Sequence, residues 1–413
     1  MDLHSGAPFW PLKSGLLQSY PAIDRDEQAD VLVVGAGVTG ALTAYHLAAA
    51  GASVVVLDKR DVATGSTAAT TGLLLYETDS DLTRLSAAIG DAGAVRAWQA
   101  GLEAIDAIEA LCASFGGCGF ERRNTLYLAS TRDDARALRG EYEQRVRQGF
   151  DVEWLFAADL DARYGIRRHA AIAGRGAQVD SFQFTHALLQ RAAALGARVY
   201  DRSELLDLEV TDTGVRGVTA RGPVVTARRA VWATGYEALD ETQAAHGQRY
   251  STWAFVSEPV AAPGGWRDRA LIWETSRPYL YARTTDDGRV MAGGQDEPFA
   301  EGHTDLALMG TKTTQLVQQL HELFPDLVID VAYRWAGTFT NTADGLPYIG
   351  TLAAHPHAWL ALGYGGNGIT FSMIAATLIR DAWLGVANPD APLFSFDRRP
   401  LQGDHRWPNA RRA

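Results

Sequence analysis

The fold is decided by Val31-Leu32-Val33-Val34-Gly35-Ala36-Gly37-Val38-Thr39-Gly40. Its first four residues form an uninterrupted aliphatic run, which is typical of a parallel strand buried on both faces. The rest has the spacing Gly-x-Gly-x-x-Gly, and a helical segment, residues 41–50, follows it before Gly51. A second aliphatic run, residues 53–57, ends at Asp58. This order of strand, helix and strand predicts a right-handed βαβ unit.

The glycine loop predicts a dinucleotide site, because each glycine has a separate task there. The first permits a tight turn, the second lets the backbone approach a pyrophosphate, and the third lets the helix pack closely on the strand. The helix N-terminus presents unpaired N–H groups and a positive dipole end to the phosphates. Asp58 lies near the expected spacing of about 20 residues and can accept hydrogen bonds from a ribose hydroxyl. The residues expected to bind the cofactor here are Gly35, Gly37, Val38, Thr39, Gly40, Asp58 and Lys59.

The acid at the end of the second strand disfavours a 2′-phosphate, so NADP is not expected, although Lys59 and Arg60 follow it. NAD and FAD both stay open from these residues alone. The next segment, residues 63–72, is rich in small and hydroxyl-bearing residues. It either donates hydrogen bonds along the phosphates and ring edge of a flavin or forms a plain surface loop. Its candidate binding residues are Gly65, Ser66, Thr67, Thr71 and Gly72.

Length and composition limit the classes of protein. The chain has 413 residues and a mass of 44.6 kDa, so we expect two domains or one large composite. Apolar residues make up 47% and charged residues 21%, which argues against disorder, collagen and coiled coils. The formal net charge of −11 argues against a general binder of nucleic acid or anionic membrane.

The sequence carries no recognisable targeting or metal-binding signal. The apolar runs are too short to span a bilayer and the first residues lack a secretory pattern, so we expect a cytoplasmic enzyme. Two cysteines, Cys112 and Cys118, lack metal-site spacing and are expected to be idle thiols. We also expect His355-Pro356-His357 to be a surface turn and the protein to need no metal.

The rest of the chain alternates helices and strands less regularly. Between residues 250 and 294, short strands separated by turns such as Pro263-Gly264-Gly265 predict an antiparallel sheet. No repeat or long linker separates the parts, so the domains are expected to be interleaved. The helices expected after the βαβ unit cover residues 94–115, 133–148, 184–195, 306–323 and 369–384.

Several motifs together give the chain a family resemblance. Besides the glycine loop with Asp58 and the Gly65-Ser66-Thr67 segment, they are Ala233-Thr234-Gly235, the block at residues 344–350 and the glycine-rich block at residues 363–369. With these motifs the sequence resembles the FAD-dependent amine and amino-acid oxidoreductases of the D-amino-acid oxidase type, which include glycine, sarcosine and γ-glutamylputrescine oxidases. The resemblance covers nearly the whole chain, from Phe9-Trp10 to the last helix.

The resemblance implies an α/β fold and FAD as the cofactor. A Rossmann-like FAD-binding domain would be interleaved with an α+β substrate domain built on an antiparallel sheet. The first would comprise residues 1–90, 160–235 and 336–413, and the second residues 91–159 and 236–335. The flavin is expected to be noncovalent, since no Cys lies in the C-terminal half and no His neighbours Gly65-Ser66-Thr67.

In the family, the last glycine-rich block leads into a helix whose N-terminus faces the flavin. Its N–H groups would stabilise negative charge on the reduced ring. The resemblance therefore places Gly366, Asn367, Gly368, Ile369 and Thr370 near the isoalloxazine, and Ala233, Thr234 and Gly235 near the adenosine half.

The substrate candidates come from the antiparallel sheet and the segment after the flavin loop. Tyr279 matches a family tyrosine that faces the substrate, and Tyr281 shares its face by strand alternation; both could equally be core aromatics. Glu77 and Asp79 could attract a cationic amine or belong to a solvated helix start. Weaker candidates for the wall are Trp335 and Gln295.

One departure from the family pattern bears on the substrate. Glycine and D-amino-acid oxidases have a carboxylate-binding Arg where this chain has Phe339. The substrate is then less acidic than an α-amino acid, or Arg277 or Arg283 anchors its carboxylate.

The resulting prediction is an FAD enzyme that oxidises the C–N bond of a primary or secondary amine, or of an amino acid, to an imine. Oxygen is the expected acceptor and hydrogen peroxide the product. Two alternatives stay open: an FAD-dependent 2-hydroxy-acid dehydrogenase, and a flavoprotein that passes electrons within a larger complex.

Overall fold

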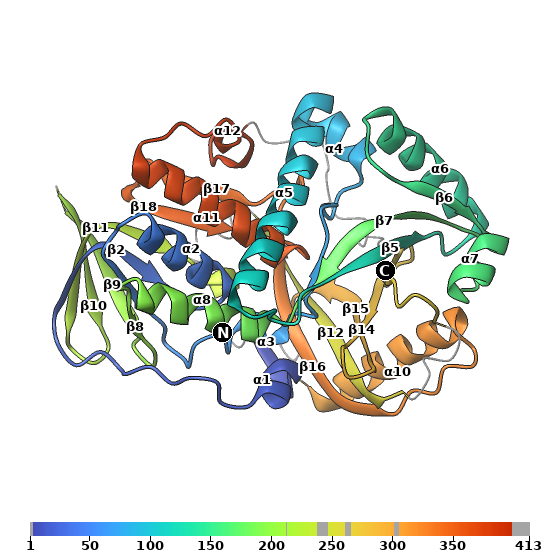
Figure 1. The fold of residues 1–413 in the computed structure, drawn as a ribbon, viewed down its shortest axis with the longest axis horizontal. Coiled ribbons are helices and arrows are strands. Elements are labelled where there is room, and N and C mark those ends of the chain that lie inside the picture. The colour runs from blue at the N-terminus through green and yellow to red at the C-terminus, as the bar shows by residue number, and fades with distance from the viewer. Residues whose placement is uncertain (1–2, 212, 238–246, 261–265, 301–304, 399–413) are drawn as a thin grey trace.

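The computed structural model describes residues 3–211, 213–237, 247–260, 266–300 and 305–398. Within them, two sheets stand side by side, one of eight strands and one of ten (Figure 1). Helices α2, α8 and α11 cover the eight-stranded sheet, while α6, α7 and α10 lie over the outer side of the ten-stranded sheet (Figure 1). The α/β fold class is confirmed.

The eight-stranded sheet contains the predicted βαβ unit. Its order is β17-β18-β11-β2-β3-β8, with the hairpin β9-β10 joined to β11, and the pairs from β18 to β8 are parallel. The strands are β2 Glu27–Val34, β3 Val54–Leu57, β8 Arg198–Tyr200, β9 Leu205–Thr211, β10 Gly214–Thr219, β11 Val224–Trp232, β17 Tyr348–Leu352 and β18 His355–Leu362. The helices covering it are α2 Val38–Ala49, α8 Ser181–Ala194 and α11 Gly368–Leu384.

The aliphatic run of β2 is buried on both faces, as a central parallel strand requires. Val31 and Val33 pack into the core cluster that contains α2, α8 and α11. Leu32 and Val34 pack into a second cluster on the opposite face, formed with residues of β9, β10 and β11. Alternation along the strand thus delivers apolar side chains to two different layers.

The ten-stranded sheet has the order β1-β16-β12-β15-β14-β13-β5-β7-β4, with β6 beside β7. Its pairs are antiparallel except for β13 with β5. The strands are β1 His4–Gly6, β4 Leu73–Leu74, β5 Glu121–Leu128, β6 Glu153–Phe156, β7 Ala170–Gln178, β12 Gln248–Pro259, β13 Leu271–Glu274, β14 Leu280–Thr284, β15 Arg289–Pro298 and β16 Val331–Asn341. The remaining helices are α1 Phe9–Ser14, α3 Ser66–Ala69, α4 Leu82–Ile89, α5 Asp91–Phe115, α6 Arg132–Arg147, α7 Ala157–Tyr164, α10 Leu306–Leu323 and α12 Ala391–Phe394, with the short turn η1 Gly235–Glu237.

The expected helices and the antiparallel sheet are confirmed, with ends shifted by a few residues. Residues 170–178, which the sequence grouped with the cofactor domain, form β7 and pair with β5 in the ten-stranded sheet. Strand β16 also runs through the expected boundary at residues 335 and 336. The division into domains stays a prediction. The turn expected at residues 263–265 lies outside the described residues.

Among the helices of the described residues, none combines the length and the apolar character that crossing a membrane requires. Over the same residues, no group of three or more His, Cys, Asp and Glu side chains could hold a metal ion. Cys112 and Cys118 are buried and unbridged. His355 and His357 belong to β18 and are not in a turn.

Candidate functional site

A cavity of about 400 Å³ is lined by residues from both sheets. One end lies at the carboxyl ends of β2, β3 and β11, where ligands of open α/β sheets are expected. The other end reaches β13, β14, β15 and β16 of the ten-stranded sheet. The cavity therefore connects the predicted dinucleotide loop with the predicted substrate wall.

The glycine loop admits no side chain at two positions. Gly35 has a φ of +102°, and a Cβ there would lie 2.4 Å from the carbonyl oxygen of Ala233. A Cβ on Gly40 would lie 1.8 Å from the carbonyl oxygen of Gly35. Gly40 does not line the cavity; it brings α2 close to the end of β2, which is the packing task expected of the third glycine.

Asp58 holds the loop in place from the end of β3. Its carboxylate accepts hydrogen bonds from the N–H groups of Ala36, at 2.6 Å, and Arg60, at 2.8 Å. Burial raises the pKa of Asp58, and these hydrogen bonds oppose that shift. A carboxylate can accept more than two hydrogen bonds, so ribose hydroxyls can still be bound.

The two cations after Asp58 are engaged with an acid. Glu237 pairs with Lys59 at 3.0 Å and with Arg60 at 2.8 Å. With Asp58, which Arg60 also faces, this end of the cavity holds two carboxylates for two cations, and this agrees with a ribose that carries no 2′-phosphate.

The hydroxyl-rich segment after Ala63 is an anchored part of the cavity wall, so the alternative of a plain surface loop is wrong. The indole N–H groups of Trp10 and Trp335 donate to the carbonyls of Thr70, at 2.6 Å, and Ala69, at 2.8 Å. Trp335 thus supports the loop from behind and does not line the cavity.

Inside the same loop, Thr67 links the two segments that are expected to face the phosphates of the cofactor. Its hydroxyl accepts a hydrogen bond from the N–H of Val38 at 3.0 Å, and its carbonyl accepts one from Ser181 at 2.8 Å. Gly72 has a φ of +73° and packs against the carbonyl of Val179 outside the cavity.

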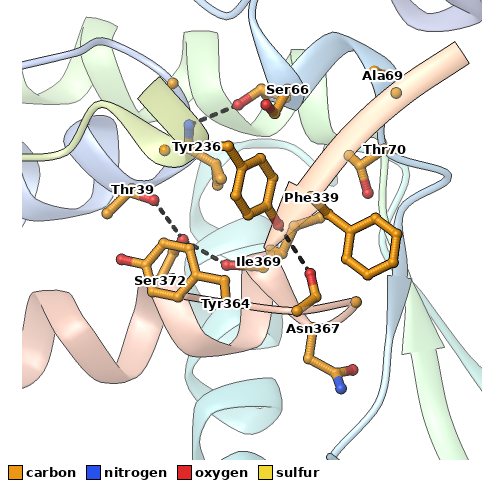
Figure 2. A pocket seen from close by; sticks show the side chains of 18 of the residues that line it. Thr39, Ser66, Ala69, Thr70, Tyr236, Phe339, Tyr364, Asn367, Ile369 and Ser372 are labelled. Atoms are coloured by element: carbon orange, nitrogen blue, oxygen red, sulfur yellow. Dashed lines mark hydrogen bonds between the residues drawn. The ribbon is translucent and has the colours of Figure 1, made fainter. Parts of the chain in front are cut away.

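The start of α11 closes the cavity between the two sheets (Figure 2). The hydroxyls of Thr39 and Ser372 are 2.7 Å apart and join α11 to the N-terminus of α2. Tyr236 donates to the carbonyl of Gly365 at 2.9 Å, which orders the glycine-rich turn (Figure 2). Two helix N-termini therefore converge on one cavity, a favourable setting for phosphate and for a reduced flavin.

The turn before α11 is also tied to the segment after β4. Asp79 accepts from the N–H of Gly366 at 2.9 Å, and the side chain of Asn367 donates to the carbonyl of Glu77 at 2.9 Å. Thr370 donates to the carbonyl of Leu75 at 3.2 Å and does not line the cavity.

The lining has unsatisfied polar atoms that suit a polar, elongated ligand. Ser66 Oγ, Thr234 Oγ1 and both amide atoms of Asn341 are buried without a hydrogen-bond partner in the described residues. Buried polar groups normally have partners, so these atoms mark where a ligand would donate or accept. Their positions along the cavity fit a dinucleotide with an attached ring system.

The substrate end is walled by aromatic side chains. Tyr279 and Tyr281 both line it, with ring centroids 5.8 Å apart, and the Arg277 guanidinium lies 4.6 Å from the Tyr279 ring centroid. Burial raises the pKa of Tyr279 well above its usual range, and that of Tyr281 is raised for the same reason, so both phenols stay neutral. Phe339 lines the same cavity (Figure 2). Its ring stacks on that of Tyr250, with the centroids 5.6 Å apart.

Glu77 is buried, with 5% of its surface exposed. The alternative interpretation, in which Glu77 belongs to a solvated helix start, is therefore wrong. Arg145 donates to it at 3.2 Å and to Glu141 at 2.8 Å. Burial raises the pKa of Glu77 although Arg145 opposes the shift. Glu141 in turn accepts from the N–H groups of Leu82 and Thr83, both at 2.9 Å, and so holds the start of α4.

Of the two arginines considered as carboxylate anchors, only Arg277 lines the cavity. Arg283 is buried and donates to the carbonyls of Thr71 at 3.0 Å and Gly72 at 3.1 Å. Gln295 is outside as well and donates to Gln319 at 2.8 Å.

Most of the residues named from the sequence therefore surround one cavity. The residues named from the sequence that do not line it are Gly40, Gly72, Arg283, Gln295, Trp335 and Thr370. The named residues that line it are Gly35, Gly37, Val38, Thr39, Asp58, Lys59, Gly65, Ser66, Thr67, Thr71, Glu77, Asp79, Ala233, Thr234, Gly235, Arg277, Tyr279, Tyr281, Phe339, Gly366, Asn367, Gly368 and Ile369.

The sequence analysis missed several lining residues. Tyr127 and Trp273 stack at 5.5 Å and come from β5 and β13, whose pairing joins them. Asp81 and Asp296 line the same end, and burial raises the pKa of each to about 6. Asp81 could have been named from the sequence, because it lies two residues after Asp79. Nothing in the sequence singled out Tyr127, Trp273 and Asp296, because only the pairing of the strands places them at the cavity.

Comparisons with known proteins agree with this geometry. γ-Glutamylputrescine oxidoreductase of Escherichia coli (strain K12) is 27% identical over 405 residues, which cover 93% of this chain and 90% of that protein. A putative Rieske 2Fe-2S iron-sulfur protein of Bacillus subtilis (strain 168), YhfW, is 23% identical over 397 residues, 94% of this chain and 75% of that protein. The crystal structure of glycine oxidase from Geobacillus kaustophilus superposes with a TM-score of 0.75 at 21% identity, over 90% of this chain and 99% of that one.

The family described as "DAO: FAD dependent oxidoreductase" matches residues 30–382, a span that includes both ends of the cavity. The loop, the two helix N-termini and the unsatisfied polar atoms are the features that FAD would use. The chain is an enzyme that belongs to the DAO family of FAD-dependent oxidoreductases.

Proposed function

We propose that the protein oxidises the C–N bond of a primary or secondary amine to an imine, with noncovalent FAD and with oxygen as the final acceptor. The supporting observation is the cavity itself, which joins the dinucleotide loop to an end walled by Tyr279, Tyr281 and Phe339 and rich in carboxylates. Similarity to glycine oxidase and γ-glutamylputrescine oxidoreductase, both named for amino compounds, supports the same chemistry.

The reaction requires the protein mainly to orient the substrate for hydride transfer. When bound, FAD supplies the acceptor for a hydride. The substrate loses the C–H hydrogen next to nitrogen as hydride and one N–H hydrogen as a proton, which leaves a C=N bond. Water then adds to the imine and releases a carbonyl compound and an amine or ammonia. Oxygen takes up the two electrons with two protons and becomes hydrogen peroxide.

The roles proposed for this chain's residues follow from their environments. Tyr279 and Tyr281 are neutral phenols that orient the substrate through hydrogen bonds, because burial raises their pKa values too far for them to act as bases near neutral pH. Glu77, held by Arg145, contributes negative charge beside the start of α11. Phe339 supplies an apolar wall where a carboxylate anchor would discourage a simple amine.

Anaerobic mixing of the purified enzyme with amines, amino acids and 2-hydroxy acids tests the proposal. Amines should bleach the flavin absorbance faster than 2-hydroxy acids of the same chain length, and aerobic turnover should release hydrogen peroxide. Bleaching by hydroxy acids alone would instead support the dehydrogenase alternative, which Arg277 keeps open as a carboxylate anchor. Gel filtration with oxygen-consumption measurements would identify an electron-transfer subunit.

A further inference from the structure

The substrate end of the cavity has carboxylates from two separate segments of the chain, which form its two acidic walls. Asp79 and Asp81 belong to the segment between β4 and α4, and Asp296 belongs to β15. Burial is the main reason why the pKa of each is raised to about 6. The charge of Asp79 adds to the shift at Asp296, so the two walls are close enough to interact.

One guanidinium faces all three of these carboxylates. The charge of Arg277 partly opposes the upward pKa shift at Asp79, Asp81 and Asp296 alike. Its guanidinium also lies over the Tyr279 ring. A single positive charge cannot balance three negative ones, so an excess of negative charge remains when the carboxylates ionise.

The other cations that line the cavity in the described part of the chain do not correct this excess. Arg145 also acts on Asp81, but it already lies between two further carboxylates, Glu77 at 3.2 Å and Glu141 at 2.8 Å. Lys59 and Arg60 pair with Glu237 at the dinucleotide end. The imbalance is therefore confined to the substrate end.

A second observation points to a ligand at this end. Glu77 Oε2 and both amide atoms of Asn341 are buried, line the cavity and have no hydrogen-bond partner in the described residues. Glu77 is 5% exposed and Asn341 4% exposed. An ammonium group offers three donors and no acceptor, so it would satisfy the free carboxylate and amide oxygens.

The aromatic walls suit the rest of such a ligand. Tyr127 and Trp273 form one stacked pair, and Tyr279 and Tyr281 form a second pair of neighbouring rings. Ring faces attract cations and cover methylene groups. An alkyl chain that carries separated ammonium groups would match this alternation of aromatic and anionic surface.

The reaction explains why a second positive charge is needed. An amine can give up a hydride only when its nitrogen has a free electron pair, whereas nearby carboxylates stabilise the protonated form. Carboxylates that held only the reacting nitrogen would therefore oppose the reaction. Carboxylates that hold a different, unreacting ammonium group would not.

Resting on the proposed amine oxidation, we propose that the substrate is a diamine or polyamine, and that Asp79, Asp81 and Asp296 bind an ammonium group that does not react. The amine to be oxidised then lies at the flavin, near the start of α11, while the second ammonium lies between the two acidic walls. An α-amino acid would bring its carboxylate against the same acids.

The test compares probes of one chain length on the flavin-loaded enzyme: 1-aminobutane, 1,4-diaminobutane and 4-aminobutanoate. Dissociation constants come from calorimetry without oxygen, and reduction rates from anaerobic flavin bleaching. We expect the diamine to bind about tenfold or more tightly than the monoamine, because its second charge meets unbalanced carboxylates, and 4-aminobutanoate to bind weakest. Equal binding of the two amines, or tightest binding of 4-aminobutanoate, would overturn the proposal.

Substitutions of single carboxylates show which of them bind the second ammonium group. Asp296→Asn should reduce the diamine-to-monoamine affinity ratio about tenfold, and Asp81→Asn, which removes the charge of a second cavity-lining carboxylate, should do the same if the first variant folds poorly. Asp133→Asn, on the surface of α6 and 87% exposed, is the matched control and should keep the ratio. An unchanged ratio in both cavity variants would count against the second-ammonium site.

The outcomes also separate this inference from the function on which it rests. If monoamines bleach the flavin as well as diamines do, amine oxidation stands and the second-ammonium site fails. If only hydroxy acids bleach it, amine oxidation itself fails. If none of the compounds bleaches it, the calorimetric ratio still decides whether the acidic walls bind a second ammonium group.

Discussion

The two ends of the cavity are built in different ways. At the dinucleotide end, glycine backbone forms much of the surface and approaches carbonyls closely, and Lys59 and Arg60 both pair with Glu237. At the substrate end, side chains from several strands form the surface, and carboxylates outnumber cations. The first end can therefore accept a cofactor common to a whole family, while the second is where this chain sets its own specificity.

The largest expected effect comes from the buried ion cluster at the substrate end. Arg145→Met should lower the free energy of unfolding by about 3 to 5 kcal/mol, because it leaves Glu77 and Glu141 buried without their shared cation. Denaturant unfolding would measure this. Arg136→Met, which breaks an exposed ion pair on α6, should change it by less than about 1 kcal/mol. Similar losses in the free energy of unfolding for both variants would show that the buried ion cluster does not stabilise the substrate end.

At the dinucleotide end, the expected effect is steric. Gly40→Ala would place a Cβ 1.8 Å from the carbonyl oxygen of Gly35, so α2 must move away from β2 at a cost of about 1 to 3 kcal/mol. The purified variant should also retain less FAD, measured as flavin absorbance per protein. Gly140→Ala, in the exposed middle of α6 with open space around it, should instead stabilise the protein by about 1 kcal/mol and keep its flavin. Full flavin content in Gly40→Ala would contradict the packing argument.

A third change would make the substrate end resemble that of the amino-acid oxidases. Phe339→Arg places a guanidinium on the cavity wall, so the preference for amines over α-amino acids should shift about tenfold toward the acids. Rates of anaerobic flavin reduction with matched amines and amino acids would measure it. Phe339→Leu keeps the wall apolar and should not shift the preference. A shift of the same size in both variants would assign the effect to lost packing.

The smallest expected effect is a dependence on pH. Burial raises the pKa values of Asp79 and Asp296 to about 6, so both carboxylates lose protons as the pH rises from about 5 to 7. Amine affinity should increase by several-fold over that range, because a cation binds the ionised form.

The raised pKa values of Asp79 and Asp296 make stability change with pH in the direction opposite to amine affinity. Because the folded state holds these protons more tightly than the unfolded state does, the contribution of both groups to the free energy of unfolding decreases as the pH rises from about 4 to 6.

Calorimetric titrations of 1,4-diaminobutane at several pH values, with Asp296→Asn as the comparison, would measure the effect of pH on amine affinity. A flat affinity profile would mean that the acids remain ionised throughout.

Prediction from the sequence succeeded where function depends on neighbours in the chain. The glycine loop and the end of β3 each occupy one short segment, so their residue types and spacing indicated a cofactor site, and the family resemblance added the start of α11. Glu77 was named for its charge, but its contact with Arg145 could not be foreseen, since the two residues are 68 positions apart. Arg283 was named for its charge as well; it shares a strand face with Tyr281, but its guanidinium donates to the carbonyls of Thr71 and Gly72 and does not reach the cavity.

The sequence by itself determined the βαβ unit, the glycine loop and the helix that follows the last glycine-rich block, because hydrogen bonding and glycine geometry act over a few residues. Only the tertiary structure decided the substrate end. The register between β5 and β13 brings Tyr127 to Trp273, and β15 carries Asp296 to the same cavity as Asp79. Those contacts depend on burial of a whole sheet, and the energy of that burial is shared by strands that lie far apart in the chain.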